Sequence, residues 1–424
     1  MKYFIHTTGC KANQWDSYVI SHKLKEGGLA PCNTMSEADI VVINACTLTS
    51  GAEKDTRRFI NRCRQSNTKA KIVLAGCHAQ VYPHNAFGAD VVLGQGEKFR
   101  IEDFLDKAGS FVSADDDFDL EIGPADRLPA GKTRFFFKIQ DGCDKNCSYC
   151  VVPAARGKPR SRPLKEIVET LRRLKGKGIK EVVLTGIEIA SYRDPDTDTD
   201  LKGLLRLLEA GETPERIRIS SIDPLYLDRE FIDLMAESRK IARSLHIPLQ
   251  SGSDSILERM GRRYSAEYIK GIVGNIKERM TDAGIGMDVI VGFPGETEKD
   301  FEDTYGLLES LHLYYLHIFP YSARRGTASF TMDGPVPDSV KKERVRKLKA
   351  LDASTRLAFY ERFLGSTLTI IPEAKLHKGL YMKGFSGNYV PVCIPFQKSL
   401  ENKLVKVTIK GIDDGLVLGE LGKT

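Results

Sequence analysis

Residues Gly142–Arg156 read GCDKNCSYCVVPAAR and contain three cysteines, Cys143, Cys147 and Cys150, separated by three and then two residues. The apolar run Arg134–Gln140 directly precedes this loop and predicts a strand. A structural zinc site usually needs a fourth ligand, which so short a loop lacks. Three thiolates suit a four-iron cubane and leave one iron without a protein ligand. A zinc knuckle that borrows a distant ligand is the alternative.

From Arg134 to Phe319 the chain alternates short apolar runs with helical patterns such as Pro163–Lys175 and Lys299–Leu311. This alternation predicts a parallel sheet covered by helices, as an open sheet or a partial barrel. Active sites of barrels lie at the carboxyl ends of the strands. The expected strands are Arg134–Gln140, Glu181–Thr185, Arg216–Ser220, Ser244–Leu249, Met287–Val291 and Tyr314–Phe319. Their ends supply the candidate cofactor-binding residues Thr185, Gly186, Glu188, Ser220, Ser221, Gln250, Ser251, Val291 and Gly292.

Residues 2–108 repeat the same alternation and predict a second parallel sheet. Its expected strands are Tyr3–His6, Asp39–Asn44, Lys71–Ala75 and Val91–Leu93, with helices such as Gln14–Glu26 and Ala52–Arg64. Cys10, Cys46 and Cys77 each lie at or just past the end of one of these strands. The carboxyl ends of parallel strands share one edge of a sheet, where ligand sites form. The three thiols can therefore converge on a second cluster; buried structural cysteines are the alternative.

The rest of the chain changes character twice. Residues 113–131 are rich in Asp, Pro and Gly, which predicts an exposed linker. A long basic helix is expected over Asp338–Leu364, with Asp338 as its cap. From Ser366 onward, four β-type runs predict a small β-barrel; they are Leu368–Ile371, Tyr389–Ile394, Leu404–Ile409 and Leu416–Glu420. This tail has eight lysines, no arginine and five acids, a net charge of +3.

The composition is that of a globular protein, with 424 residues, 41% hydrophobic residues and a formal net charge of +6. The first residues, MKYFIHTT, lack the apolar run of a secretory signal. No stretch approaches the ~20 apolar residues that span a bilayer, so we expect a cytoplasmic protein with no membrane partner. In that compartment nine cysteines indicate metal or redox chemistry rather than disulfides.

The chain resembles the methylthiotransferase family of radical S-adenosylmethionine enzymes nearly end to end. The resemblance is carried by the six cysteines with their neighbours, His246–Ser253 (HIPLQSGS), Phe319–Thr327 (FPYSARRGT) and the β-type tail. It implies three domains: an N-terminal α/β domain (1–112), a partial (βα)6 barrel (132–364) and a β-barrel of the TRAM type (365–424). Cys143, Cys147 and Cys150 would hold the cluster that binds S-adenosylmethionine, and Tyr149 would meet the adenine. Cys10, Cys46 and Cys77 would hold an auxiliary [4Fe–4S] cluster.

The same resemblance implies a radical reaction that inserts a methylthio group into an unactivated C–H bond. A flavodoxin or ferredoxin would supply electrons, and a sulfur source is required. No family cysteine matches Cys32, Cys63 or Cys393; the spacing of Cys63 predicts a core position. Ala45 and Thr8 depart from the family pattern, but neither stands at an expected ligand.

The family modifies either adenosine beside a tRNA anticodon or an aspartate of a ribosomal protein. The basic tail favours tRNA, because phosphates attract lysine and arginine. The expected RNA contacts are Arg156, Arg324, Lys375, Lys378, Lys383, Lys403 and Lys406. The segment GCKANQWDS, which contains Lys11, is most similar to the corresponding segment of the branch that acts on N6-threonylcarbamoyladenosine. The isopentenyladenosine branch is the alternative. A non-catalytic iron–sulfur RNA-binding protein is a remote alternative.

Overall fold

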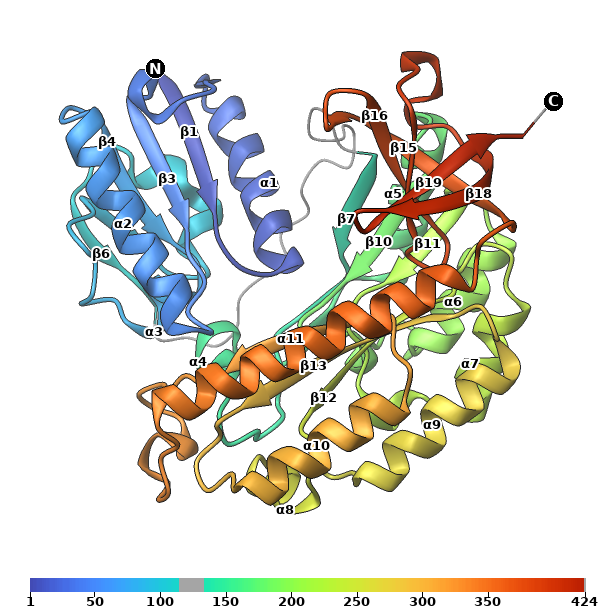
Figure 1. Ribbon diagram of the computed structural model, residues 1–424. Coiled ribbons are helices and arrows are strands. Elements are labelled where there is room, and N and C mark those ends of the chain that lie inside the picture. Colours follow the sequence, from blue (N-terminus) through green and yellow to red (C-terminus); the bar gives the residue numbers. More distant parts are fainter. Residues whose placement is uncertain (114–132, 423–424) are drawn as a thin grey trace.

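The computed structural model describes residues 1–113 and 133–422 (Figure 1). Apart from Ser113, the expected linker lies outside the described residues. Three bodies follow one another along the chain: an α/β sheet, a partial barrel and a small closed barrel. No helix in the described part is both long and apolar enough to span a bilayer.

The first body is an all-parallel sheet of six strands in the order β2-β1-β3-β4-β5-β6. Alternate residues of β3 face opposite sides: Val42 packs towards α1, whereas Val41 and Ile43 pack towards α2. The expected open sheet is confirmed, with two short edge strands that the sequence did not reveal. The bounds are β1 (Lys2–Thr7), α1 (Lys11–Glu26), β2 (Ala30–Pro31), β3 (Ile40–Asn44), α2 (Ser50–Ser66), β4 (Lys71–Ala75), α3 (Cys77–Val81), β5 (Val91–Leu93) and β6 (Gly109–Phe111).

The second body contains two parallel three-stranded sheets, β7-β10-β11 and β12-β13-β14. Parallel bridges from Ile217 to Ile241 and from Ser221 to His246 join them into a partial barrel, as expected. Helices cover its outer side (Figure 1). The bounds are β7 (Arg134–Lys138), α5 (Leu164–Gly176), β10 (Glu181–Thr185), α6 (Leu201–Ala210), β11 (Arg216–Ile219), α7 (Arg229–Glu237), β12 (Ser244–Gln250), α8 (Asp254–Arg259), α9 (Ala266–Arg279), β13 (Gly284–Val291), α10 (Glu298–Ser310) and β14 (Tyr315–Pro320).

A short segment of the second body packs against the first body. After β7, strands β8 (Gln140–Asp141) and β9 (Arg160–Ser161) pair antiparallel and close the three-cysteine loop at its base. Helix α4 (Val152–Arg156) follows the loop and packs on α3 of the first body. Helix α1 also packs on β7, so the N-terminal sheet and the barrel share an interface.

The third body is a closed barrel in the order β15-β16-β17-β19-β18. Helix α11 (Asp338–Glu361) leads into it, but Pro337 occupies the cap position and Asp338 is the first helical residue, so the expected cap was wrong. The sequence also missed β16, where Gly384 interrupts the β-type pattern. The bounds are β15 (Thr367–His377), β16 (Tyr381–Ser386), β17 (Pro391–Pro395), β18 (Val405–Asp413) and β19 (Leu416–Leu421).

Candidate functional site

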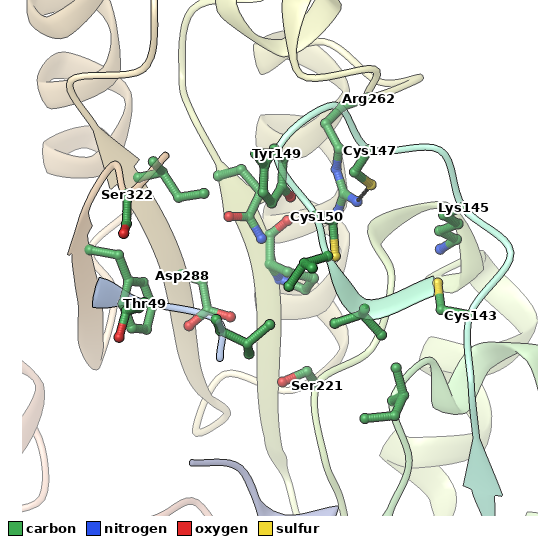
Figure 2. A pocket seen from close by; sticks show the side chains of 18 of the residues that line it. Thr49, Cys143, Lys145, Cys147, Tyr149, Cys150, Ser221, Arg262, Asp288 and Ser322 are labelled. Carbon is green, nitrogen blue, oxygen red and sulfur yellow. Dashed lines mark hydrogen bonds between the residues drawn. The ribbon is translucent and has the colours of Figure 1, made fainter. Parts of the chain in front are cut away.

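A cavity of about 320 Å³ lies at the carboxyl ends of the barrel strands. Cys143, Cys147 and Cys150 all line it, so the structure brings the loop cysteines to one space. Figure 2 shows these cysteines on one side of the cavity and Thr49 and Ser322 on the other. The N-terminal body thus contributes to the wall of the barrel's cavity.

Backbone contacts fix the three-cysteine loop. The amide of Cys143 donates to the Gly157 carbonyl (3.1 Å), and the amide of Ser148 donates to the Met260 carbonyl (3.0 Å). Gly142 has φ +77°, and a Cβ there would lie 2.0 Å from the Lys158 carbonyl oxygen. Only glycine allows the two ends of the loop to approach this closely.

Burial disfavours the thiolate forms of Cys143 and Cys150 when no cation is bound. Burial raises the pKa of Cys143 to about 11 and that of Cys150 to about 12. Arg262 donates from Nη1 to the Cys147 sulfur at 3.3 Å, a contact that favours negative charge on sulfur. A bound metal replaces the thiol proton. Three half-buried thiols around a cavity therefore fit an iron–sulfur cluster with one open iron.

The structure separates the expected cofactor residues into two groups. Tyr149, Glu188, Ser221 and Gln250 line the cavity. The others do not line it: Thr185, Gly186, Ser220, Ser251, Val291 and Gly292. Ser251, for example, is fully buried and shares a hydrogen bond with the Thr304 hydroxyl at 3.2 Å.

Charged residues that the sequence interpretation missed also line the cavity. Lys145 donates to Glu188 at 2.7 Å and to Asp223 at 2.5 Å. Arg262 reaches the cavity from the turn after α8. No local pattern marks Asp223 or Arg262, because they meet the cysteine loop only through the barrel's closure.

A second missed feature is a carboxylate held between two imidazoles. Asp288 accepts from His246 Nε2 at 2.8 Å and from His317 Nδ1 at 3.2 Å. Burial alone would raise the pKa of Asp288, but these hydrogen bonds lower it to about 2. The ligand atoms of the three side chains lie within 4.8 Å of one another. Asp288 lines the cavity, and the His317 side chain is 56% exposed.

Cys10, Cys46 and Cys77 follow three neighbouring strands, β1, β3 and β4. The three thiols lie close enough to perturb one another: burial, and then Cys77 and Cys10, raise the pKa of Cys46 to about 12. Gly9 leaves the space that the Cys46 sulfur occupies, because a Cβ there would lie 3.0 Å from it. Three thiols at one edge of the sheet are, like the loop cysteines, a suitable ligand set for a four-iron cluster.

The two cysteine sites are adjacent in space. Leu48 and Thr49, two and three residues after Cys46, line the barrel cavity. The Ser50 amide donates to the Ser322 hydroxyl at 3.0 Å and closes this side of the cavity. A substrate in the cavity would therefore contact both the three-cysteine loop and the segment that follows Cys46.

The structure corrects two of the expected RNA contacts. Arg156 is 1% exposed and forms ion pairs with Asp141 and Asp16, so it is not available to RNA. Arg324 is 5% exposed and pairs with Glu53 at 2.7 Å. Basic runs usually lie on a solvated surface, but here ion pairs across the domain interface hold both guanidinium groups inside.

The tail lysines lie on the surface of the closed barrel. Lys375, Lys378, Lys403 and Lys406 are exposed, and Lys383 is half-buried. Lys378 pairs with Asp414 at 2.9 Å, and the Lys383 ammonium lies 4.9 Å from the Phe385 ring centre.

The remaining cysteines lie elsewhere. Cys63 packs in the N-terminal core, as its spacing predicted. Cys393 is buried, and Cys32 is half-buried.

Two family models match the chain. The Radical SAM superfamily model matches residues 137–308, which contain the three-cysteine loop. The model described as Uncharacterized protein family UPF0004 matches residues 2–94, which contain Cys10, Cys46 and Cys77. Residues 95–136, which neither model matches, include β6 of the first body and the start of β7 of the second.

Curated relatives match nearly the whole chain. Threonylcarbamoyladenosine tRNA methylthiotransferase MtaB of Aquifex aeolicus is 38% identical and covers 96% of this chain and 100% of its own. The enzyme of the same name from Bacillus subtilis is 34% identical, with 95% and 92% covered. The tRNA-2-methylthio-N(6)-dimethylallyladenosine synthase of Thermotoga petrophila is 33% identical, with 90% and 88% covered.

Among solved structures, the radical S-adenosylmethionine methyltransferase TsrM of Kitasatospora setae has a TM-score of 0.56 at 17% identity. That likeness covers 78% of this chain and 74% of TsrM, and it shows the fold alone. The family itself follows from the 38% identity to an MtaB enzyme over almost the full length of both chains. The chain belongs to the family of radical S-adenosylmethionine tRNA methylthiotransferases.

Proposed function

We propose that this protein inserts a methylthio group at C2 of N6-threonylcarbamoyladenosine beside the anticodon of tRNA. The observation that carries the proposal is the pair of three-thiol sites: Cys143, Cys147 and Cys150 line the cavity, and Cys46 of the second set lies two residues before Leu48 in the cavity wall. Four MtaB enzymes, among them those of Aquifex aeolicus and Bacillus subtilis, match the chain at 32–38% identity. The proposed substrate is thus a tRNA. Since tRNA is modified in the cytoplasm, we propose that the protein acts there.

Cys143, Cys147 and Cys150 would hold the cluster that binds S-adenosylmethionine. When bound, the cluster and S-adenosylmethionine supply the carbon radical that a strong C–H bond demands. The chain's own residues orient the reactants: Tyr149, Glu188, Ser221 and Gln250 line the cavity where the cofactor would lie. Arg262 holds positive charge against the Cys147 sulfur, and Lys145 of the loop is paired with Glu188 and Asp223.

Cys10, Cys46 and Cys77 would hold the second, auxiliary [4Fe–4S] cluster, where the sulfur would be delivered to the substrate. Burial disfavours free thiolates here, since it raises the pKa of both Cys10 and Cys46, and metal ligation would replace their protons. A sulfur source and an electron donor of the flavodoxin or ferredoxin class would complete the reaction.

The proposed division of labour follows the three bodies. Residues 1–112 would present the sulfur, residues 132–364 would generate the radical, and residues 365–424 would bind RNA. Exposed lysines on the small barrel suit the phosphate backbone, because a lysine is a point charge without base specificity.

The isopentenyladenosine substrate is the second candidate, because the Thermotoga petrophila relative is named for dimethylallyladenosine. Its identity of 33% is close to the 34% of the Bacillus subtilis MtaB enzyme. The two substrates differ in chemistry: the threonylcarbamoyl group carries a carboxylate, whereas the isopentenyl group is apolar.

Two triple variants test the division of labour. Changing Cys10, Cys46 and Cys77 to alanine should leave 5′-deoxyadenosine formation measurable and abolish the methylthio product. Changing Cys143, Cys147 and Cys150 to alanine should abolish both. Methylthio product from the first variant at the wild-type rate would rule out the sulfur-delivering role.

A further inference from the structure

A network of five charged side chains lies buried behind the Cys10/Cys46/Cys77 site. Asp16 accepts from Lys98 at 2.7 Å, from Lys138 at 2.6 Å and from Arg156 at 3.0 Å. Asp141 accepts from Lys138 at 2.6 Å and from Arg156 Nη1 at 2.9 Å to each oxygen. Each side chain is at most 8% exposed. The network joins α1 of the N-terminal body to the barrel.

The five groups do not balance. Three cations, Lys98, Lys138 and Arg156, face two carboxylates, Asp16 and Asp141, which leaves one positive charge in excess. The attraction of the cations, against burial, holds the pKa of both carboxyls well below the ordinary value. An uncompensated buried charge is strongly unfavourable, and burial, together with the two neighbouring cations, lowers the pKa of Lys98 to about 8. A negative group nearby would offset the excess charge.

Two amide side chains connect the network to a thiol of the auxiliary site. Gln95 accepts from the Lys98 ammonium and donates from Nε2 to the Cys77 sulfur at 3.4 Å. Asn13 accepts from the Arg156 guanidinium and, at 3.8 Å, from the Cys77 thiol. Each amide therefore lies between a cation of the network and the Cys77 sulfur.

The charge of the proposed auxiliary cluster matches the excess. An oxidised four-iron core carries two positive charges and three thiolates carry three negative ones, so the ligated cluster has a net charge of minus one. The Gln95 and Asn13 contacts place the network one side chain away from the Cys77 sulfur, close enough for its charge to act on a group held there. A group with this charge at the three thiols would neutralise the network.

We infer that this network is the electrostatic counterpart of the auxiliary cluster and sets its reduction potential. Reduction adds a second negative charge to the ligated cluster, and the excess positive charge stabilises that state. The five side chains are therefore positioning residues, and Gln95, which donates to the Cys77 sulfur, links them to the site. The inference rests on the proposed function, because it requires a cluster at Cys10, Cys46 and Cys77.

The test uses the full chain with Cys143, Cys147 and Cys150 changed to alanine, so that only the auxiliary cluster is measured. In this background Lys98→Met removes a positive charge, and Asp141→Asn removes a negative one. The midpoint potential, followed by electron paramagnetic resonance, should fall in the first variant and rise in the second. We expect each shift to change the reduced-to-oxidised ratio at fixed potential about tenfold, which is about 59 mV for one electron.

Lys71→Met is the matched control, because Lys71 contacts the Leu105 carbonyl and lies outside the network. Lys98→Arg keeps the charge and should restore the potential. A merely structural network would move both charge variants in the same direction, or neither, and either outcome overturns the inference. If Lys98→Met fails to load iron, the rise in Asp141→Asn still decides the sign. A background protein that binds no iron refutes the auxiliary cluster itself, which is a failure of the proposed function.

Discussion

Gly9→Ala adds a single methyl group and should disrupt the Cys10/Cys46/Cys77 site while leaving the Cys143/Cys147/Cys150 site intact. Gly9 has φ +99°, and a Cβ there would lie 2.5 Å from the Cys46 Cβ and 3.0 Å from its sulfur. Real Cβ atoms essentially never approach another heavy atom to 2.5 Å, so Cys46 must move. Because Cys46 is a proposed ligand, the expected effect is loss of the auxiliary cluster.

The magnitude follows from two contributions. A side chain in the left-handed region costs about 1–2 kcal/mol. Overpacking against a buried neighbour adds about 1–3 kcal/mol. Gly28 is the matched control, because it has φ +79° but a Cβ there would meet no atom within 4 Å, so Gly28→Ala carries only the first contribution. The difference between the variants, about 1–3 kcal/mol, corresponds to a change of about fivefold to 150-fold in an equilibrium constant.

The assay is iron content after anaerobic reconstitution, with 5′-deoxyadenosine and methylthio product as activity readouts. Wild type and Gly28→Ala should hold about eight irons, in two cubanes. Gly9→Ala should hold about four, still form 5′-deoxyadenosine and give little methylthio product. Full iron content with normal product in Gly9→Ala would refute the placement of Cys46 as a ligand, and equal losses in both variants would refute the steric argument.

Three further predictions concern other parts of the chain. Alanine at Cys143, Cys147 and Cys150 should remove about half of the iron and all 5′-deoxyadenosine formation; unchanged iron would contradict the assignment. Deletion of residues 365–424 should weaken tRNA binding and make the slope of log affinity against log salt shallower, while 5′-deoxyadenosine still forms without tRNA. His317→Phe should lower kcat/KM about tenfold or more for threonylcarbamoyl tRNA, because an exposed imidazole next to Asp288 of the cavity wall can donate to a carboxylate but not to an isopentenyl group. Equal losses with isopentenyl tRNA would refute this discrimination.

Much of the fold could be predicted because short-range patterns determine it. Strand β4, at Lys71–Ala75, is an apolar run with a glycine directly after it, and the structure has the same bounds. Placing Cys10, Cys46 and Cys77 at strand ends was sufficient to bring them together, since parallel strands share an edge. Strand β16 was missed because YMKGFS lacks a continuous β-type pattern.

The failures concern contacts between residues far apart in sequence. Arg156 follows a loop and precedes other basic residues, a pattern typical of a solvated surface. Its burial depends on Asp16, 140 residues away, and on the packing of the N-terminal sheet against the barrel. The Asp288 pair with His246 and His317 likewise requires three neighbouring barrel strands in register. Neither charge network has a local sequence signal.

The proposed reaction and its substrate can be tested together by mass spectrometry of tRNA nucleosides after reaction with the purified, reduced enzyme and S-adenosylmethionine. Two tRNAs should be compared, one with N6-threonylcarbamoyladenosine and one with isopentenyladenosine beside the anticodon. We expect the 2-methylthio derivative from the threonylcarbamoyl tRNA and little from the other. Product from the isopentenyl tRNA alone would contradict the substrate assignment, and the absence of product from both tRNAs would contradict the claim that this enzyme modifies either of these adenosines.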